Sequence, residues 1–218
     1  MRALSFAGLL AVLALAGCGG GGTNSTTSTT QATTDAHGCV VTNPPPAKAR
    51  SGKAPTAILD TQKTYDAVIE TNCGSFTILL DPKQSPHAVA SFVELAQAGY
   101  FDNTVFHRIV PGFVIQGGDP TASGAGGPGY TTVDTPPSSA TYTHGVVAMA
   151  KTGAQPAGTS GSQFFVVTSA DAGLPPDYAI IGKVTKGLGV VDRIGKLGDA
   201  SEQPTEVVEI KHITITTS

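Results

Sequence analysis

The sequence predicts a mainly β domain, a closed antiparallel β-barrel with helices at its ends. Short runs rich in β-branched and aromatic residues recur along the chain, and glycine or proline bounds each run. Only two stretches show the spacing of an amphipathic helix. Because the expected strands and helices do not alternate regularly, a doubly wound parallel sheet is disfavoured.

The domain is expected to begin with a β-hairpin. Apolar and polar residues alternate over Tyr65–Glu70, and the apolar residues between positions 76 and 80 again share one parity. A period of two is typical of half-buried strands. Gly74, which lies between the two runs, suits the turn.

An amphipathic helix is expected next. Ser85 can cap its start and Pro86 fits the first helical position. Apolar residues then recur at helical spacing at Val89, Phe92, Val93 and Ala96. Gly99 can end the helix, because glycine adopts the left-handed conformation at low cost.

The remainder of the domain reads as short strands and one more helix. The β-rich runs lie at residues 104–110, 113–116, 146–150, 163–168 and 179–181. The spacing of apolar residues over 187–196 predicts a second short helix. The last strand is expected over 207–216, and its apolar parity shifts between Ile210 and Ile213, which predicts a β-bulge.

The first 18 residues have the pattern of an export signal. Arg2 supplies the positive start, and residues 4–16 form a short apolar core. The core ends in Leu15-Ala16-Gly17-Cys18, which resembles the cleavage box of bacterial lipoproteins. The resemblance implies a lipid on Cys18 and a place at the cell membrane, facing the extracytoplasmic side. A plain secretory signal is the alternative.

Residues 19–62 are expected to be a flexible tether, and residues 63–218 the folded domain. Glycine, serine, threonine and proline dominate the tether, so it carries too little apolar surface to offset the entropy of ordering the chain. If Cys18 carries a lipid, Cys39 and Cys73 remain as a pair in an oxidising setting. A disulfide between them would fix the tether to the first hairpin; two unpaired thiols are the alternative.

Composition and spacing argue against several classes of function. The net charge is −3 and no basic patch occurs, which gives no support for nucleic-acid binding. The run Gly124–Gly129 matches the letters of a dinucleotide loop, but no helix is expected after it. The histidines lack metal-ligand spacing. We therefore expect no nucleic-acid partner, no cofactor and no metal.

The most informative segment is the run Phe106–Asp119. It places one guanidinium, that of Arg108, and one amide, that of Gln116, among large apolar side chains. In strand-like stretches successive side chains face opposite sides, so Phe106 and Arg108 can share one face. A charged fork of donors beside an aromatic wall suits the binding of a peptide carbonyl next to an apolar group. These residues predict a site for a proline-containing peptide.

The same run resembles the signature of the cyclophilin-type peptidyl-prolyl cis-trans isomerases. The likeness continues in family order from about residue 65 to residue 216, and its further segments are Gln116–Thr121, Gly126–Tyr130, Gly145–Ala150, Gly161–Phe165 and Gly182–Val184. The resemblance implies an eight-stranded closed antiparallel barrel capped by two helices. It also implies an enzyme that rotates X-Pro bonds, assists protein folding and needs no cofactor.

The resemblance implies the following roles. Arg108 would be the catalytic donor, with Phe113 and Gln116 beside it in the catalytic set. The other residues expected to contact substrate are Phe106, His107, Val114, Ala150, Lys151, Thr152, Gln163, Phe165, Leu174 and Tyr178. We assign no acid–base role to His107.

Some positions depart from the family pattern. Val114 stands where many members have methionine, and Lys151-Thr152 replaces asparagine-alanine. The chain contains no tryptophan, and the family's rim indole falls near Gly173, so we expect weak binding of cyclosporin. The expected protein is a monomeric isomerase that acts on exported proteins. A proline-binding or chaperone module without turnover, on the cell envelope, is the alternative.

Overall fold

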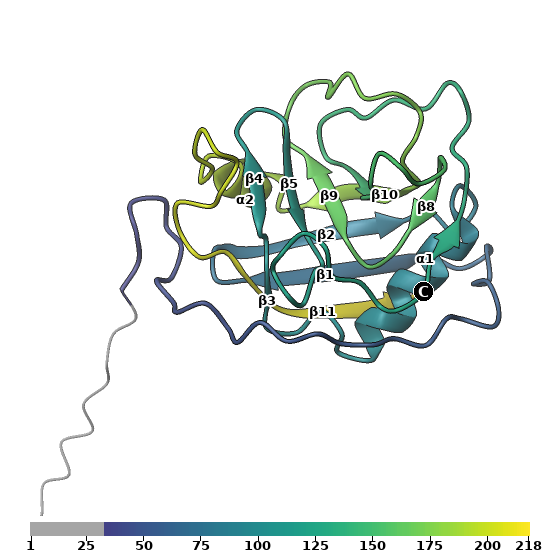
Figure 1. Cartoon of the computed structure of the whole chain (residues 1–218), viewed down its shortest axis with the longest axis horizontal. Coiled ribbons are helices and arrows are strands. Elements are labelled where there is room, and N and C mark those ends of the chain that lie inside the picture. The colour runs from purple at the N-terminus through teal and green to yellow at the C-terminus, as the bar shows by residue number, and fades with distance from the viewer. Residues whose placement is uncertain (1–32) are drawn as a thin grey trace, which may run out of the picture. The chain divides into compact units, whose positions relative to one another are not determined.

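The computed structural model describes residues 33–218, which form a mainly β domain with two helices (Figure 1). The helices are α1 (Pro86–Gln97) and α2 (Leu188–Ile194). The strands are β1 (Tyr65–Thr71), β2 (Gly74–Leu80), β3 (Thr104–Val105), β4 (Arg108–Val110), β5 (Val114–Gly117), β6 (Thr132–Val133), β7 (Val146–Met149), β8 (Thr159–Ser160), β9 (Phe164–Val167), β10 (Ile180–Lys186) and β11 (Glu209–Thr217). The prediction of a mainly β domain with two helices is confirmed.

Nine strands form one antiparallel sheet in the order β3-β11-β1-β2-β10-β7-β9-β5-β4, and β6 pairs with β8 separately. The large sheet curls strongly, so that β4, β5 and β9 run across the direction of β1, β2 and β11 (Figure 1). The closed eight-stranded barrel that we expected is not seen. Within residues 33–218 no ladder joins the edge strands β3 and β4. The backbone continues from β3 through Phe106 and His107 into β4, so the two edges of the sheet are connected along the chain and not by strand pairing.

The local predictions for the hairpin and the last strand agree with the structure. Strands β1 and β2 pair in register, with Gly74 at a φ of 113°, a conformation that glycine adopts readily. On the other side of β1, Glu70 pairs with His212 and Thr71 pairs with Ile210. Lys211 is therefore the extra residue of a β-bulge, between the two isoleucines where the parity shift predicted it.

Helix α1 covers the inner face of the sheet and completes the main core. Pro86 lies at its first turn as expected, although the Ser85 side chain makes no capping hydrogen bond. The core includes the fully buried rings of Phe76, Phe92, Phe101, Phe106 and Phe164. Several of these rings meet edge to face, for example Phe92 and Phe164 at 5.5 Å between centroids.

A second, smaller apolar cluster lies on the outer face of β5, β7 and β9. It contains Val114, Tyr142, Val146, Ala148, Phe165, Val167 and Ile180. Along β9, Phe164 and Val166 belong to the main core, whereas Phe165 and Val167 belong to the outer cluster. This alternation follows from the period of two in a strand, and it gives the sheet two apolar faces.

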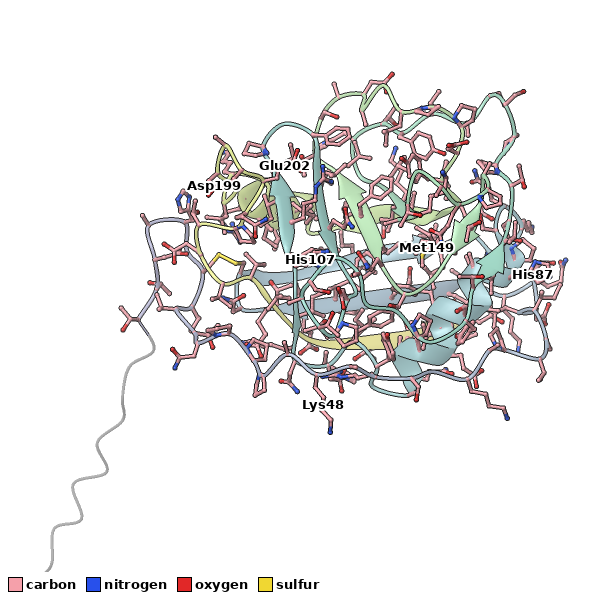
Figure 2. The ribbon with its side chains drawn as sticks, viewed as in Figure 1. Lys48, His87, His107, Met149, Asp199 and Glu202 are labelled. Atoms are coloured by element: carbon pink, nitrogen blue, oxygen red, sulfur yellow. A yellow bond between two sulfur atoms is a disulfide. The ribbon has the colours of Figure 1, made fainter. Side chains whose placement is uncertain are left out.

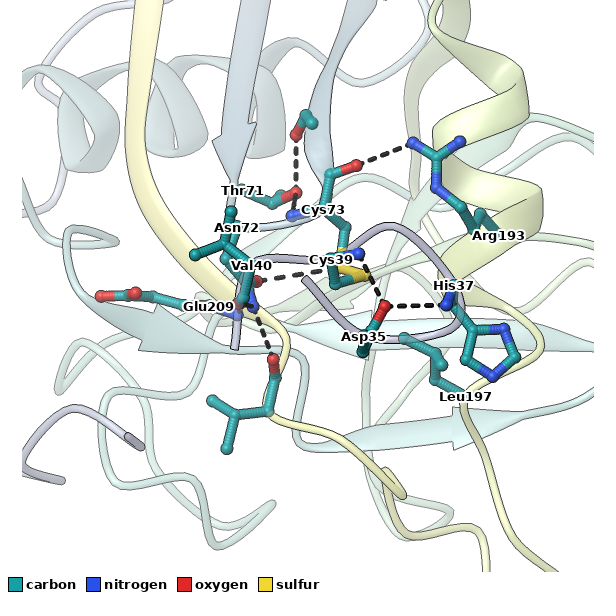
Figure 3. Close-up of a disulfide and its surroundings, with 12 residues drawn as sticks. Asp35, His37, Cys39, Val40, Thr71, Asn72, Cys73, Arg193, Leu197 and Glu209 are labelled. Carbon is teal, nitrogen blue, oxygen red and sulfur yellow. Dashed lines mark hydrogen bonds between the residues drawn. A yellow bond between two sulfur atoms is a disulfide. The ribbon is translucent and has the colours of Figure 1, made fainter. Parts of the chain in front are cut away.

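Residues 33–62 lie along the domain rather than away from it. Cys39 and Cys73 form a disulfide (Figure 3). Beside it, the Asn72 side chain donates to the carbonyls of Val40 and Val207 at 2.9 and 2.8 Å. Further along, the Arg50 guanidinium donates to the Tyr100 carbonyl at 2.6 Å.

The described part of the expected tether is thus held by a covalent bond and by polar contacts with the domain. Composition alone did not predict this, because the contacts use backbone groups rather than apolar surface. The domain boundary at residue 63 stays a prediction. Residues 1–32, with Cys18 and the rest of the expected tether, lie outside the described residues.

Candidate active site

The β4–β5 hairpin positions the guanidinium of Arg108. Gly112 turns the chain with a φ of 69°, and Arg108 is the cross-strand partner of Gln116. Side chains directly opposite one another lie on the same face of a sheet. Arg108 Nη1 accordingly donates to Gln116 Oε1 at 3.3 Å.

A line of amide side chains extends from Arg108 across the outer face. Gln116 Nε2 donates to Gln163 Oε1 at 3.0 Å, and Gln163 Nε2 donates to the carbonyls of Gly124 and Gly126, each at 2.9 Å. Each amide therefore has both a donor and an acceptor role assigned by its neighbours. The line fixes the orientation of the Gln116 oxygen that faces Arg108.

The buried carboxylate of Asp119 shapes the loop that ends this line. It accepts hydrogen bonds from the backbone amides of Thr121 at 2.7 Å, Ser123 at 3.1 Å and Gly126 at 3.0 Å. Burial acts to raise the pKa of Asp119, but the hydrogen bonds from Thr121 and Gly126 outweigh it and lower the pKa below its usual value. The ionised carboxylate thus holds the loop in place.

Glu202 is a second partner of Arg108, and it comes from the loop between α2 and β11. Its Oε2 accepts from Arg108 Nε at 2.6 Å. Figure 2 shows Glu202 next to β4, and its carbonyl accepts from the amide of Ile109 at 3.0 Å. No local pattern in the sequence indicates a role for Glu202, because it reaches Arg108 from 94 positions away.

An apolar cavity of about 180 Å³ opens beside the guanidinium. It is lined by Arg108, Phe113, Val114, Gln116, Ala150, Lys151, Phe165, Leu174 and Tyr178. Tyr178 meets Phe165 edge to face at 5.5 Å, and its backbone is held by the hydroxyl of Tyr142 through two hydrogen bonds of 2.8 and 2.9 Å. Packing between rings and hydrogen bonds to the backbone therefore hold this wall of the cavity in place.

A wider groove adjoins this cavity. Its volume is about 520 Å³, and it shares Gln116, Ala150 and Lys151 with the apolar cavity. Thr152 and Gln163 line only the groove. The structure thus places most of the predicted substrate-contacting residues in two adjoining hollows.

Lys151 stands at the junction of the two hollows with its side chain only 4% exposed. Its Nζ lies 3.1 Å from Asp177 Oδ2, 3.2 Å from the Gln155 carbonyl and 5.4 Å from the centre of the Tyr178 ring. Asp177 is on the loop that carries Leu174 and Tyr178. The lysine therefore ties this rim loop to the segment after β7.

Two of the expected contact residues lie elsewhere. Phe106 is fully buried in the main core, against Phe76 and Phe164, and does not line the apolar cavity. The alternation that placed it beside Arg108 fails because β3 ends at Val105 and β4 begins at Arg108. His107 also lies outside both hollows.

The imidazole of His107 is largely shielded from solvent. Both its ring nitrogens are buried and have no hydrogen-bond partner among the described residues. Burial lowers the pKa of His107, because desolvation disfavours the charged ring. The lowered pKa favours the uncharged form of the ring, and the absence of an acid–base role for His107 stays a prediction.

The arrangement can bind a small apolar ring next to a polar backbone. The cavity accepts the ring, while Arg108 supplies donors and Gln116 supplies an amide at its edge. Across residues 33–218 no group of three or more His, Cys, Asp or Glu side chains gathers as a metal site. What the site offers is shape and fixed hydrogen-bond donors.

Comparisons with known proteins show which family the chain is similar to. Residues 67–215 match the family model described as cyclophilin type peptidyl-prolyl cis-trans isomerase/CLD. Peptidyl-prolyl cis-trans isomerase-like 1 of Neurospora crassa is 39% identical over 150 residues, which cover 66% of this chain and 90% of the relative. Peptidyl-prolyl cis-trans isomerase CYP18-2 of Arabidopsis thaliana is 37% identical over 150 residues, with the same two coverages.

Among solved structures, the chain is similar to a cyclophilin type peptidyl-prolyl cis-trans isomerase of Cryptosporidium parvum. The sequence identity is 35% and the TM-score is 0.64, with 70% of this chain and 98% of that chain covered. Another crystal structure of that protein was determined in the presence of the dipeptide Ala-Pro.

These relatives correct one expectation. They are isomerases of fungi, a plant and a protist, and none of their names describes a lipoprotein. The location expected from residues 1–18, lipid-anchored at the cell membrane on its extracytoplasmic side, is therefore wrong. It depended on a positive residue, a short apolar stretch and the small residues before Cys18, all of which lie outside the described residues. Among residues 33–218 no helix is long and apolar enough to cross a membrane.

Proposed function

The chain belongs to the cyclophilin-type peptidyl-prolyl cis-trans isomerase family, and on that premise we propose that Arg108 and the apolar cavity beside it catalyse X-Pro bond rotation. The observation that carries the proposal is one guanidinium at the edge of a cavity of about 180 Å³ walled by Phe113, Phe165 and Tyr178. A proline ring fits the cavity, and the bond to be rotated then lies beside the guanidinium.

The reaction needs no nucleophile, because only the rotation barrier has to fall. The peptide C–N bond has partial double-bond character, and its rotation barrier is about 18–20 kcal/mol. For X-Pro bonds the two isomers differ by only about 0.5–1 kcal/mol. A site that fits the twisted amide better than either planar form therefore accelerates both directions.

Arg108 supplies the interaction that favours the twisted state. As the bond twists, resonance is lost and the prolyl nitrogen regains its lone pair, which can accept a hydrogen bond. A guanidinium donor directed at that nitrogen is therefore worth more in the transition state than in the ground state. We assign the carbonyl side of the substrate to the Gln116 amide, and the residues before proline to the strip Ala150–Thr152.

We further propose that the clients are folding polypeptides that include exported proteins. The disulfide between Cys39 and Cys73 supports this, because disulfides persist mainly in oxidising compartments. We propose that the enzyme works as a monomer.

The rim of the cavity suggests weak binding of cyclosporin. Gly173 lies at the position where the family's rim indole would stand, and a Cβ built there would meet nothing within 4 Å. The rim therefore lacks the large flat side chain that would cover a bulky cyclic ligand. Titration of the isomerase activity with cyclosporin should give inhibition only at micromolar or higher concentration; nanomolar inhibition would contradict this view.

The proposal is tested by the rate of cis-to-trans conversion of an X-Pro peptide, with Arg108→Ala compared with the wild type. Loss of a transition-state donor typically costs roughly 100- to 1,000-fold in kcat, and we expect a fall of that size. The thermal midpoint should stay near the wild-type value, because Arg108 is partly exposed on a sheet edge. Equal rates for the two proteins would refute the catalytic role and favour a module that binds proline segments without turnover.

A further inference from the structure

The loop between α2 and β11 brings one carboxylate to the guanidinium of the active site. Glu202 Oε2 accepts from Arg108 Nε at 2.6 Å, and both side chains are partly exposed, at 47% and 32%. Glu202 is 94 positions away in sequence and does not line the apolar cavity. It therefore touches Arg108 without being placed to touch a ring bound in the cavity.

The backbone at Glu202 is fixed in an unusual conformation. Its φ is 66°, in the left-handed region that a residue with a side chain adopts at a cost. Such residues persist where the surrounding structure determines them, and they cluster at functional sites. Here the Glu202 carbonyl accepts from the amide of Ile109 at 3.0 Å, which attaches the loop to β4 next to Arg108.

The carboxylate of Asp199 closes the loop from within. It accepts from the backbone amides of Ser201 at 2.8 Å and Gln203 at 2.9 Å, so it holds the residues on both sides of Glu202. The Ser201 side chain donates to the same carboxylate, and these hydrogen bonds lower the pKa of Asp199. The turn is consequently built around an ionised side chain and presents Glu202 toward β4.

The two partners of Arg108 divide its donors. A guanidinium carries five N–H groups in one rigid plane. Glu202 takes the Nε–H, and Gln116 takes one hydrogen of Nη1. These two contacts, on different edges of the fork, fix the plane and leave Nη2 without a protein acceptor among the described residues.

We propose that Glu202 is a positioning residue, which orients the Arg108 guanidinium so that its remaining donors face the prolyl nitrogen. The inference rests on the proposed function of Arg108. With a neutral amide in place of the carboxylate, the charge-assisted hydrogen bond to Arg108 Nε becomes a weaker neutral one, and the flexible arginine stem is held less firmly. The donor then spends less time in the productive direction, which weakens an interaction made only in the transition state.

The test compares Glu202→Gln with the wild type in the isomerisation assay with separate kcat and KM. Because the pair is partly exposed, we expect a moderate loss, roughly three- to tenfold in kcat, with KM little changed. Glu206→Gln is the matched control, since it removes the same charge from the same loop at an exposed position without a hydrogen-bond partner among the described residues. The control should keep the wild-type kcat.

The double variant Arg108→Ala with Glu202→Gln decides whether Glu202 acts through Arg108. If it does, Glu202→Gln changes nothing further once Arg108 is removed. Equal losses in both backgrounds, or a rate above the wild type for Glu202→Gln alone, would overturn the inference. A wild-type rate for Glu202→Gln would also overturn it.

These variants distinguish failure of the catalytic role of Arg108 from failure of the positioning role of Glu202. If Arg108→Ala itself keeps full activity, the proposed function fails first. If Arg108→Ala is impaired but Glu202→Gln equals the wild type, only the positioning role fails. The ¹⁵N resonance of Arg108 Nε gives a second readout, because its exchange with water should be slow in the wild type and in Glu206→Gln and fast in Glu202→Gln.

Discussion

Phe164 and Phe165 are neighbours in the sequence, yet they belong to different parts of the molecule. Phe164 is fully buried in the main core and meets Phe92, Phe101 and Phe106 edge to face or nearly so. Phe165 points to the outer face, where it meets Tyr142 and Tyr178 and lines the apolar cavity. One residue step in a strand separates a ring that holds the fold from a ring that forms the site.

The same division applies to the other strands of the sheet. Ile115 and Val166 face the main core, whereas Val114 and Gln116 face the site. The inner face is closed and dry, and its packing determines stability. The outer face carries its large side chains around an open hollow, so a change at the wall of the hollow alters the site more than it alters the main core.

Truncation of Phe164 and of Phe165 tests most sharply whether the inner and outer faces have separate roles. Phe164→Ala should lower the free energy of unfolding by about 3–5 kcal/mol, because it leaves a cavity that its closed surroundings cannot fill. Phe165→Ala should cost less, about 1–3 kcal/mol, since solvent reaches the enlarged hollow. Urea unfolding followed by circular dichroism gives both values.

Activity per folded molecule should show the opposite order. Phe165→Ala should raise KM for a proline peptide severalfold, and Phe164→Ala should leave it near the wild-type value below the unfolding transition. If Phe164→Ala impaired KM as much as Phe165→Ala, the two faces would not be separable.

Removal of the disulfide should have a smaller effect, which should be confined to stability. Cys39→Ser with Cys73→Ser should lower the free energy of unfolding by about 2–4 kcal/mol, because the bridge restricts a long loop of the unfolded chain. The bridge lies at the β1–β2 turn, and neither cysteine lines the apolar cavity or the adjoining groove. The rate per folded molecule should therefore stay unchanged. A fall in kcat would show that residues 33–62 help to set the outer face.

His107 should add the smallest effect, on the pH dependence of stability. Its pKa is lowered in the folded state by burial, so the unfolded chain binds a proton more readily. Stability from this residue is present above the unfolded pKa of about 6.5 and is lost as the pH falls through that value toward the folded pKa. Between pH 7.5 and 5.5 the wild type should lose more stability than His107→Gln. Equal slopes would contradict the buried neutral ring.

Local patterns in the sequence predicted the parts of the fold that depend on neighbours along the chain. The alternation over Tyr65–Glu70 and the spacing of α1 gave the hairpin and the helix, because period follows directly from backbone geometry. Phe106 shows the limit of such reasoning. It lies in a break between β3 and β4, where alternation no longer fixes a face.

The parts that could not be predicted depend on residues far apart in sequence. Glu202 reaches Arg108 from a loop 94 positions away. Its backbone is in the left-handed conformation, which a glutamate in the sequence does not predict. Whether the barrel closes depends on pairing between the edge strands β3 and β4 of the curled sheet. The number of strands expected from the sequence does not determine this pairing. The family resemblance, in contrast, placed together seven residues that line one cavity in the structure: Arg108, Phe113, Val114, Gln116, Phe165, Leu174 and Tyr178.

The most direct test of the account replaces Arg108 by lysine, which keeps the charge but loses the planar fork. Lysine cannot serve Glu202, Gln116 and the prolyl nitrogen from one fixed plane. We therefore expect kcat for Arg108→Lys to fall at least roughly 30-fold, close to Arg108→Ala, with peptide binding by NMR titration unchanged. A wild-type kcat for Arg108→Lys would contradict the claim that the oriented guanidinium lowers the rotation barrier.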